Sequence, residues 1–484
     1  MKIRRFIKCH KLELSFFVFL FSFSLFLMLF LRMDIDYFWH YKAGEYMVQY
    51  STILTQDVFS WSLFHSPWVS HEWLFEILLY GLDYLFGDFH LFIYVFSVSF
   101  GLLLFLFFIQ KREYLKNVPF ALLWTIFFSL IFTGLSGRPQ LLSFLFLAIS
   151  VWLVFDFFYH PNSKKIYFLP LVSLFWANIH GGSSNLPYLL CFFAIFAGLF
   201  QFSCRKIEAV RLTRSQIITY LVVALLCMLG ILFNPHGITM LFYPYQNMGD
   251  SLMLSTIAEW QPSNLNELSH YVYFIFVFFV LVVMIFSKKK IRFIDALFYI
   301  VFLYLGLKSI RFWFFSYIVF SFFIFYYISE RKQDCHSCFL ILMFSFLLFL
   351  IFVHSFSYSS IITTKTLSDE AITVLEKEKP ERLFNYYDYG AYLIYRDIPV
   401  FIDGRADLYS GKIYRDYQDI SRLRYRFTNL LSKYQFDYFI VPKKSGIFSY
   451  LKNSHVYRMI YSDDTCVIFK QNKSTRSCYG NDHV

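Results

Sequence analysis

Apolar runs long enough to cross a lipid bilayer recur along the first three quarters of this chain. Because a bilayer core needs roughly 20 apolar residues per helix, about eleven such runs can be distinguished. They lie near residues 13–31, 90–109, 118–136, 139–158, 166–179, 186–203, 216–233, 270–287, 293–308, 311–329 and 338–355. The chain has 484 residues, of which 58% are hydrophobic and only 16% charged, which is too apolar for a soluble globular protein of this size. We therefore predict a polytopic α-helical membrane protein.

Lysine and arginine collect in every second connection between these runs. The N-terminal segment "MKIRRFIKCHK" is basic, and the same excess returns in "KRE" at 111, "SKK" at 163, the segment from "CRK" at 204 to Arg214, "SKKKIR" at 287 and "ERK" at 330. Since cytoplasmic connections hold the excess of positive charge, the N-terminus is predicted to be cytoplasmic. The alternate connections and the C-terminal tail are then extracytoplasmic. The net charge of +11 follows from this topology and gives no support to nucleic-acid binding.

The tail after residue 355 has a different character. A helical pattern at 368–379 is followed by a β-like run "PVFID" at 399–403 and a long amphipathic stretch at 414–434. The runs "FDYFIVP", "YRMIYSD" and "TCVIFKQ" then resemble strands, the last two forming a closing hairpin. We predict a transmembrane domain at 1–355 and a small extracytoplasmic α/β domain at 356–484.

Acidic, aromatic, histidine and arginine residues gather in the predicted outer connections and the tail. Carboxylates there can serve as general bases or metal ligands, guanidinium groups can bind a phosphate through two oxygens, and indole and phenol rings can stack on sugars. The chain contains no GxxxxGK[ST] phosphate-binding loop. An activated donor outside the cytoplasm would then be lipid-linked, most simply a sugar on a polyprenyl phosphate or diphosphate. We expect these residues to form one site at the outer membrane surface.

Three short elements in these connections resemble motifs of the GT-C fold membrane glycosyltransferases, particularly the catalytic subunits of oligosaccharyltransferases. Asp34 and Asp36 follow the first helix, "TIAE" at 256–259 matches a later acidic element, and "YYDYG" at 386–390 stands where that family has "WWDYG". The chain also resembles uncharacterised bacterial GT-C-like proteins. That likeness rests on the Asp36 to His40 segment, an "HGG" loop at 180–182 and "IDGRADLY" at 402–409.

The resemblance implies a glycosyltransferase that moves a sugar or glycan from a polyprenyl-linked donor to a glycan, lipid or protein acceptor. Asp36 would be the catalytic base, assisted by Asp34 or Glu259. Arg311, Arg138 and Arg405 would hold the donor phosphate. The implied substrate-binding residues are Trp39, His40, Glu72, His180, Trp260, Tyr387, Asp388, Tyr389 and Asp403.

Two departures limit what the resemblance carries over. The second outer connection reads "SGRPQ", without the acidic pair that helps to hold a metal in oligosaccharyltransferases. No cofactor is therefore expected firmly, and a Mg²⁺ or Mn²⁺ ion on Asp36 and Glu259 stays an alternative. Because Tyr386 and Tyr387 replace the family's tryptophans, recognition of an Asn-x-Ser/Thr peptide is not carried over.

Other interpretations of the same residues remain open. Asp34 and Asp36 could be solvated carboxylates at a helix end, Arg311 could anchor a helix by snorkelling, and Asp403 could form a local turn. A polar outer surface would also suit a flippase or transporter of lipid-linked glycans, or a non-catalytic homologue that assists assembly. The nearly purely apolar helix interiors disfavour a transporter.

Overall fold

A computed structural model describes residues 11–31, 33–110, 136–246, 251–328, 345–348, 351 and 367–472. The chain divides into two compact units. The first, called here the helical unit, comprises Met1–Arg32, Phe86–Gln246 and Ser255–Tyr358. The second, called the α/β unit, comprises Met33–Leu85, Asn247–Leu254 and Ser359–Val484.

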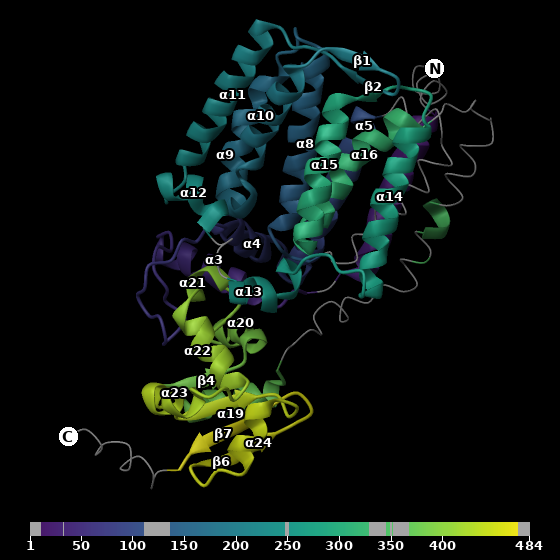
Figure 1. Ribbon diagram of the computed structural model, residues 1–484. Helices are drawn as coiled ribbons and strands as arrows, with labels where there is room; N and C mark the ends of the chain where they lie inside the picture. Colours follow the sequence, from purple (N-terminus) through teal and green to yellow (C-terminus); the bar gives the residue numbers. More distant parts are fainter. Residues whose placement is uncertain are drawn as a thin grey trace. The chain divides into compact units, whose positions relative to one another are not determined.

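The helical unit is built from long apolar helices (Figure 1). They are α2 (Lys11–Leu27), α5 (His90–Ile109), α8 (Gln140–Tyr159), α9 (Leu169–Ile179), α10 (Leu186–Gly198), α11 (Arg214–Leu232), α12 (Ile238–Gln246), α14 (Tyr271–Phe286), α15 (Phe293–Lys308) and α16 (Trp313–Tyr327). Short 3₁₀ turns interrupt or extend the connections: η1 (Met28–Phe30), η3 (Lys165–Phe168), η4 (Gly181–Ser183), η6 (Ala258–Trp260), η7 (Leu268–His270) and η8 (Ile310–Phe312). Leu, Phe and Ile side chains cover these helices on every face, as expected for helices surrounded by other helices or by lipid.

Four helical stretches among the described residues are long and apolar enough to cross a membrane. They are Trp73–Ile109, Gln140–Tyr159, Arg214–Leu232 and Ile310–Tyr327, and Lys165–Ile179 and Tyr271–Phe286 are shorter apolar helices. Every predicted run that falls on described residues is helical over most of its length. The runs at 118–136 and 338–355 lie largely outside the described residues, so the structure supports a helical membrane protein without establishing eleven spans.

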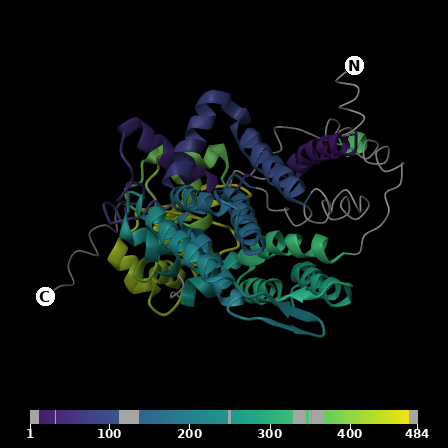
Figure 2. The same ribbon diagram turned by 90° about the horizontal axis from the view of Figure 1, so that it is seen from above.

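Two of the predicted cytoplasmic connections meet at one end of the helical unit. Strand β1 (Phe202–Cys204) pairs antiparallel with β2 (Ile207–Ala209), and β2 pairs in parallel with β3 (Ile291–Arg292). Ile207 lies opposite Ile291, and the ammonium group of Lys290 donates to Oγ of Ser203 at 2.5 Å. The β1–β2 hairpin lies beside α15 (Figure 2). The basic segments near 205 and 290 therefore share one end of the unit, as the alternation of charge predicts.

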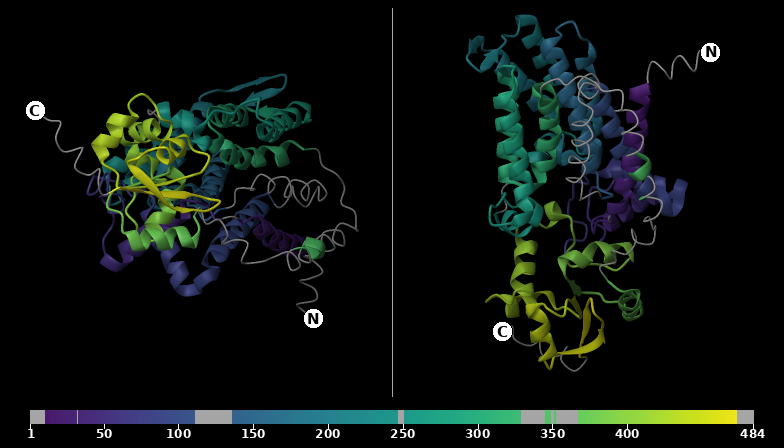
Figure 3. Two further views of the ribbon diagram at one scale, coloured as in Figure 1. Left: turned by 90° about the horizontal axis from the view of Figure 1, so that it is seen from below. Right: turned by 90° about the vertical axis from the view of Figure 1, so that its right-hand side faces the viewer.

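The α/β unit contains a four-stranded sheet in the order β4-β5-β7-β6. Strand β4 (Leu383–Asn385) pairs in parallel with β5 (Tyr438–Val441), whereas β7 (Val467–Gln471) pairs antiparallel with β5 and with β6 (Tyr457–Ser462). All residues of β4 and β5 are buried, as expected for strands covered on both faces. Helices lie on either side of the sheet (Figure 3). They are α19 (Asp369–Glu378), α20 (Tyr387–Tyr395), α21 (Ala406–Tyr409), α22 (Lys412–Ser421), α23 (Phe427–Tyr434) and α24 (Gly446–Lys452).

Several predictions for the tail are confirmed and two are wrong. The helix at 368–379, the strand in "FDYFIVP" and the closing hairpin are present. The run "PVFID" is not a strand, because only Val400 pairs, through an isolated bridge to Ser60. The stretch 414–434 is two helices, since Leu423 between them adopts a left-handed conformation with φ of 51°.

The first predicted outer connection folds together with the tail. It carries α3 (Tyr37–Tyr50) and α4 (Trp73–Phe86), and α3 packs against α20. The Trp61 backbone N–H donates to the Val400 carbonyl, and its indole N–H donates to the Leu383 carbonyl at 3.0 Å. The domain boundary predicted at 355/356 lies outside the described residues. These bonds show that residues 33–85 belong to the same compact unit as the tail.

Candidate functional site

The predicted site residues fall into two groups, one within each compact unit. The helical unit carries Arg138, His180, Glu259, Trp260 and Arg311. The α/β unit carries Asp34, Asp36, Trp39, His40, Glu72, Tyr387, Asp388, Tyr389, Asp403 and Arg405.

In the helical unit, Arg138 and Glu259 form an ion pair. The Arg138 Nη1 donates to Oε2 of Glu259 at 3.0 Å, with the two side chains 21% and 40% exposed. The phenol of Tyr94 donates to the Arg138 backbone carbonyl at 2.9 Å, and the hydroxyl of Ser309 donates to the Glu259 backbone carbonyl at 3.0 Å. These backbone bonds hold both residues of the pair in place although they are 121 positions apart.

Arg311 is held by a buried chain of hydrogen bonds. Its Nη2 donates to Nε2 of His180 at 3.2 Å, and Nδ1 of His180 lies 2.6 Å from Oγ of Ser143. The indole N–H of Trp176 also donates to that hydroxyl, at 2.9 Å. A guanidinium can only donate, so Nε2 of His180 must be the acceptor and Nδ1 must carry the proton. A neutral His180 therefore fixes the direction of Arg311.

The two arginines act together on Glu259. Burial raises the pKa of this carboxyl, but the positive charges of Arg138 and Arg311 and a hydrogen bond from Trp260 outweigh that effect, and the pKa lies below its ordinary value. Glu259 is thus ionised at neutral pH. Two guanidinium groups and one carboxylate leave a net positive charge, which suits a phosphate better than a metal cation.

His180 is fully buried behind Arg311. It was predicted to bind substrate, and its burial instead gives it a positioning role. The loop that carries it contains Gly182, where a Cβ would lie 3.7 Å from Nε2 of His180 and 3.9 Å from Nη2 of Arg311. The "HGG" segment therefore lies directly against the arginine side chain.

In the α/β unit, Asp36 and Trp39 lie against Gly404. A Cβ at residue 404 would be 2.0 Å from Oδ1 of Asp36 and 3.3 Å from Nε1 of Trp39, so any side chain there would displace the Asp36 carboxylate. Two elements that carry the family resemblance, Asp36 to His40 and "IDGRADLY", are thus in direct contact. Asp34 accepts the Asp36 backbone N–H at 2.9 Å, which gives Asp34 a local turn-forming role.

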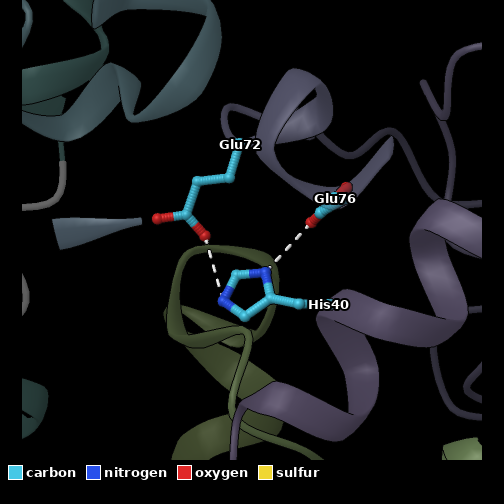
Figure 4. Close-up of side chains that lie close together, drawn as sticks. All are labelled: His40, Glu72 and Glu76. Carbon is cyan, nitrogen blue, oxygen red and sulfur yellow. Dashed lines mark hydrogen bonds and ion pairs between the residues drawn. The ribbon is translucent and has the colours of Figure 1, made fainter. Parts of the chain in front are cut away.

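His40 lies between two glutamates (Figure 4). Its Nε2 is 3.4 Å from Oε2 of Glu72, and its Nδ1 is 3.3 Å from Oε1 of Glu76. All three side chains are buried, and their ligand atoms lie within 4.8 Å of one another, a spacing compatible with a metal ion. Gly44 permits this arrangement, because a Cβ there would be 2.1 Å from the Glu76 backbone carbonyl oxygen and would push α3 away from α4.

Arg405 does not fit the predicted phosphate-binding role. It is 1% exposed, and its guanidinium donates to Asp57 at 2.6 Å and to Asp403 at 2.8 and 2.7 Å. Asp403 also accepts the hydroxyl of Tyr409 at 2.6 Å. Since its contacts are with residues of its own unit, Arg405 joins the segment at residues 33–85 to the tail. Asp403, predicted to bind substrate, is the buried counter-ion of this arginine.

The "YYDYG" residues separate into structural and exposed positions. The Tyr389 hydroxyl donates to the Thr465 carbonyl at 2.9 Å and so fastens α20 to the β6–β7 hairpin. The Tyr387 hydroxyl donates to the Gly404 carbonyl at 3.1 Å, close to Asp36. Asp388 is exposed. Of these three predicted binding residues, Tyr387 adjoins Asp36 through Gly404, and Tyr389 has a packing role.

The predicted metal pair, Asp36 and Glu259, is not supported by its surroundings. Glu259 is already neutralised by Arg138 and lies in the field of Arg311, which repels a cation. The donor set of His40, Glu72 and Glu76 fits a cation better, because it combines one imidazole with two carboxylates.

Sequence reasoning missed several residues of these groups. Glu76 lies four residues after Glu72, but its position inside the apolar run of α4 gave no reason to assign it to a site. His71 faces Glu72 at 3.4 Å and was visible in "SHEWLFE". Ser143 and Asp57 carried no such signal, because single serine and aspartate residues are common in any sequence.

Comparisons with known proteins give distant structural likenesses only. No protein-family model matches the chain, and no curated protein matches its sequence. The crystal structure of an oligosaccharyltransferase from Archaeoglobus fulgidus, in the apo form, aligns with a TM-score of 0.46 and 9% sequence identity. The alignment covers 89% of this chain and 69% of that chain.

Proposed function

We propose that this protein is a membrane glycosyltransferase that takes a sugar or glycan from a polyprenyl phosphate or diphosphate and transfers it to an acceptor on the extracytoplasmic face. The proposal is carried by the convergence of Arg138 and Arg311 on one carboxylate, Glu259, at the connections of an apolar helical unit. A lipid-linked phosphate matches both features, because its apolar chain can lie along the helices and its anionic group can bind the arginines.

The arginines would hold the leaving group. Arg311 is fixed by neutral His180, and Arg138 is fixed by Tyr94 and Glu259. A phosphate that approaches this pair meets two permanently charged donors, each able to form two parallel hydrogen bonds. Glu259 would reduce the repulsion between the two guanidinium groups and would orient Arg138 until the phosphate binds. Charge that develops on the departing phosphate is then stabilised by groups already in place.

Asp36 would be the base for the acceptor. A lone pair of the acceptor oxygen or nitrogen forms the new bond to the anomeric carbon, the bond from that carbon to the phosphate oxygen breaks, and the phosphate leaves with the electron pair. The acceptor proton passes to Asp36. Gly404 lies against the Asp36 carboxylate, and Trp39 and Tyr387 beside it would supply aromatic faces for a sugar ring.

The acceptor side of the reaction would belong to the α/β unit. Asp388 is exposed next to Tyr387, and both lie at the start of α20, which packs against α3. The acceptor can be a glycan, a lipid or a protein. A flippase that lacks transferase activity would need the phosphate-binding arginines but no base at Asp36, so the two functions make different predictions for this residue.

A deletion strain of the source organism tests the proposal. Its surface glycans would be compared with those of the parent by mass spectrometry of released glycans, after complementation with the wild type, Asp36→Asn or Arg311→Gln. We expect a glycan to be lost or shortened on deletion and restored by the wild type alone. Full restoration by Asp36→Asn would contradict a transferase and favour a flippase or an assembly role.

A further inference from the structure

The most unusual cluster of ionisable groups in the α/β unit is the one around His40. Both ring nitrogens of this imidazole face a carboxylate, Glu72 on one side and Glu76 on the other (Figure 4). His40, Glu72 and Glu76 are all buried. Two buried carboxylates require positive charge nearby, because the desolvation of an unpaired carboxylate costs several kcal/mol. His40 can donate a proton to only one of them when it is neutral, and His71, whose Nε2 lies 3.4 Å from Glu72, is the second imidazole of the cluster.

We propose that His40, Glu72 and Glu76 bind a divalent transition-metal ion, with Mn²⁺ or Zn²⁺ preferred over Mg²⁺ and Ca²⁺. One imidazole nitrogen and two carboxylate oxygens form a mixed donor set that suits these softer ions, whereas Mg²⁺ and Ca²⁺ prefer oxygen ligands alone. The site lies in one compact unit and involves neither of the donor-phosphate arginines. It does not rest on the proposed function.

The distances around His40 are longer than strong hydrogen bonds and leave room for a metal ion. A charge-assisted N–H···O bond is usually about 2.7–2.9 Å long. The separations from His40 to Glu72 and to Glu76 are 3.4 and 3.3 Å. Two ligands that each lie about 2.0–2.2 Å from a common ion are themselves roughly 3.0–3.5 Å apart in tetrahedral or octahedral geometry. Each separation lies in that range, but the two carboxylates face different ring nitrogens, so an ion on one nitrogen of His40 requires the carboxylate on the other side to turn towards it.

Each carboxylate also contacts a second side chain that orients it, as is usual for metal ligands in proteins. Glu72 turns one oxygen to His40 and the other to Nε2 of His71, at 3.4 Å. Glu76 turns one oxygen to His40 and accepts the hydroxyl of Ser70 on the other, at 2.9 Å. The carboxylates are thus oriented before any ion arrives, and the close packing of α3 on α4 at Gly44 fixes the distance between the two helices.

Metal content and metal titration of the full chain, purified in detergent, test this site. The wild type, Glu72→Gln, Glu76→Gln and Ser70→Ala would be stripped with chelator and titrated with Mn²⁺, followed by electron paramagnetic resonance of the free ion. Zn²⁺, Mg²⁺ and Ca²⁺ would be used as competitors. Asp83→Asn is the matched control, because Asp83 lies on the same helix and accepts the hydroxyl of Tyr41, outside the cluster.

We expect near-stoichiometric Mn²⁺ binding by the wild type and by Asp83→Asn, with displacement by Zn²⁺ and little effect of equimolar Mg²⁺ or Ca²⁺. Glu72→Gln and Glu76→Gln should lose this binding, and Ser70→Ala should weaken it about 10-fold or more. Absence of saturable Mn²⁺ and Zn²⁺ binding by the folded wild type would overturn the proposal, and so would equal binding by all variants. The wild-type titration alone shows whether the chain binds Mn²⁺ or Zn²⁺ saturably. The site is therefore tested even if one of the variants fails to fold.

Discussion

Arg311 donates a hydrogen bond to Nε2 of His180 at 3.2 Å, and this single contact fixes both the tautomer of the histidine and the direction of the guanidinium. The other nitrogen of His180 is tied to Ser143, which also accepts from Trp176. The chain of bonds links a residue of the η8 turn to the buried side of α8 and α9. It makes His180 a positioning residue for the proposed phosphate site.

Removal of this support should weaken donor binding. In His180→Ala, Arg311 loses a hydrogen bond that involves a charged group, worth about 1.5–3 kcal/mol, so the KM for a polyprenyl phosphate donor should rise roughly 10-fold or more, with a smaller change in kcat. His180→Gln keeps an acceptor for Arg311 and a donor for Ser143 and should recover most of the affinity. Equal KM values for the two variants would contradict the positioning role.

Gly404 should be intolerant of any side chain. The Cβ of Gly404→Ala would lie 2.0 Å from Oδ1 of Asp36, so the carboxylate must move and transfer activity should fall at least about 10-fold, as a displacement of a catalytic group by an ångström costs that much or more. Gly81→Ala is the control, because a Cβ at residue 81 in α4 has no atom within 4 Å. The Gly81 variant should keep full activity and gain up to about 1 kcal/mol in stability. Normal turnover by Gly404→Ala would contradict a catalytic role for Asp36.

The buried Arg405 should matter for stability. Arg405→Met leaves Asp57 and Asp403 without their counter-ion, and loss of one partner of a buried pair typically costs about 3–5 kcal/mol. Thermal unfolding of the detergent-solubilised chain would measure this loss. Arg424→Met is the control, since the Arg424 side chain is 43% exposed and 3.5 Å from Asp419, and its removal should cost less than about 1 kcal/mol. Similar midpoints for the two variants would contradict a structural role for Arg405.

The Arg138–Glu259 pair should contribute little to stability, and its contribution should depend on pH in one direction. The pKa of Glu259 is lowered in the folded chain, so its stabilising effect is complete above its ordinary value and is lost as pH falls through the lowered pKa. Because both side chains are partly exposed, the effect should be at most about 1 kcal/mol. The difference in unfolding midpoint between the wild type and Glu259→Gln should be constant from pH 6 to 8 and should disappear in acid. A difference that grows in acid would mean that Glu259 is protonated in the folded state.

Much of the fold follows from sequence patterns, and the site only in part. The length of the apolar runs gives the helices of the bundle, and β-branched and aromatic runs around a turn give the β6–β7 hairpin. The alternation of charged connections also predicts that Arg138, Glu259 and Arg311 lie on one side of the membrane. These features depend on local periodicity and on the direction of the chain, both of which are visible in the sequence.

The failures have a common physical cause. The role of Arg405 depends on Asp57, which is 348 residues away, and no local pattern pairs them. Glu76 stands within an apolar helix, so its contact with His40 appears only once α3 and α4 are packed at Gly44. The run "PVFID" has strand composition, but in the fold only Val400 pairs, with Ser60 of the first connection. In all three cases the conformation or the role of the residue depends on a partner that is far away in the sequence.

The central claim, that Asp36 and Arg311 serve transfer from a polyprenyl-linked donor, is tested most directly by transfer of a radiolabelled sugar. The purified chain would be mixed with a synthetic polyprenyl phosphate sugar and with membranes of the deletion strain as the source of acceptor. The account predicts labelled product with the wild type and with the exposed control Asp88→Asn. With Asp36→Asn the rate should fall about 10²- to 10⁴-fold while donor binding is retained, and Arg311→Gln should weaken donor binding itself. Equal rates for the wild type and Asp36→Asn would contradict the account.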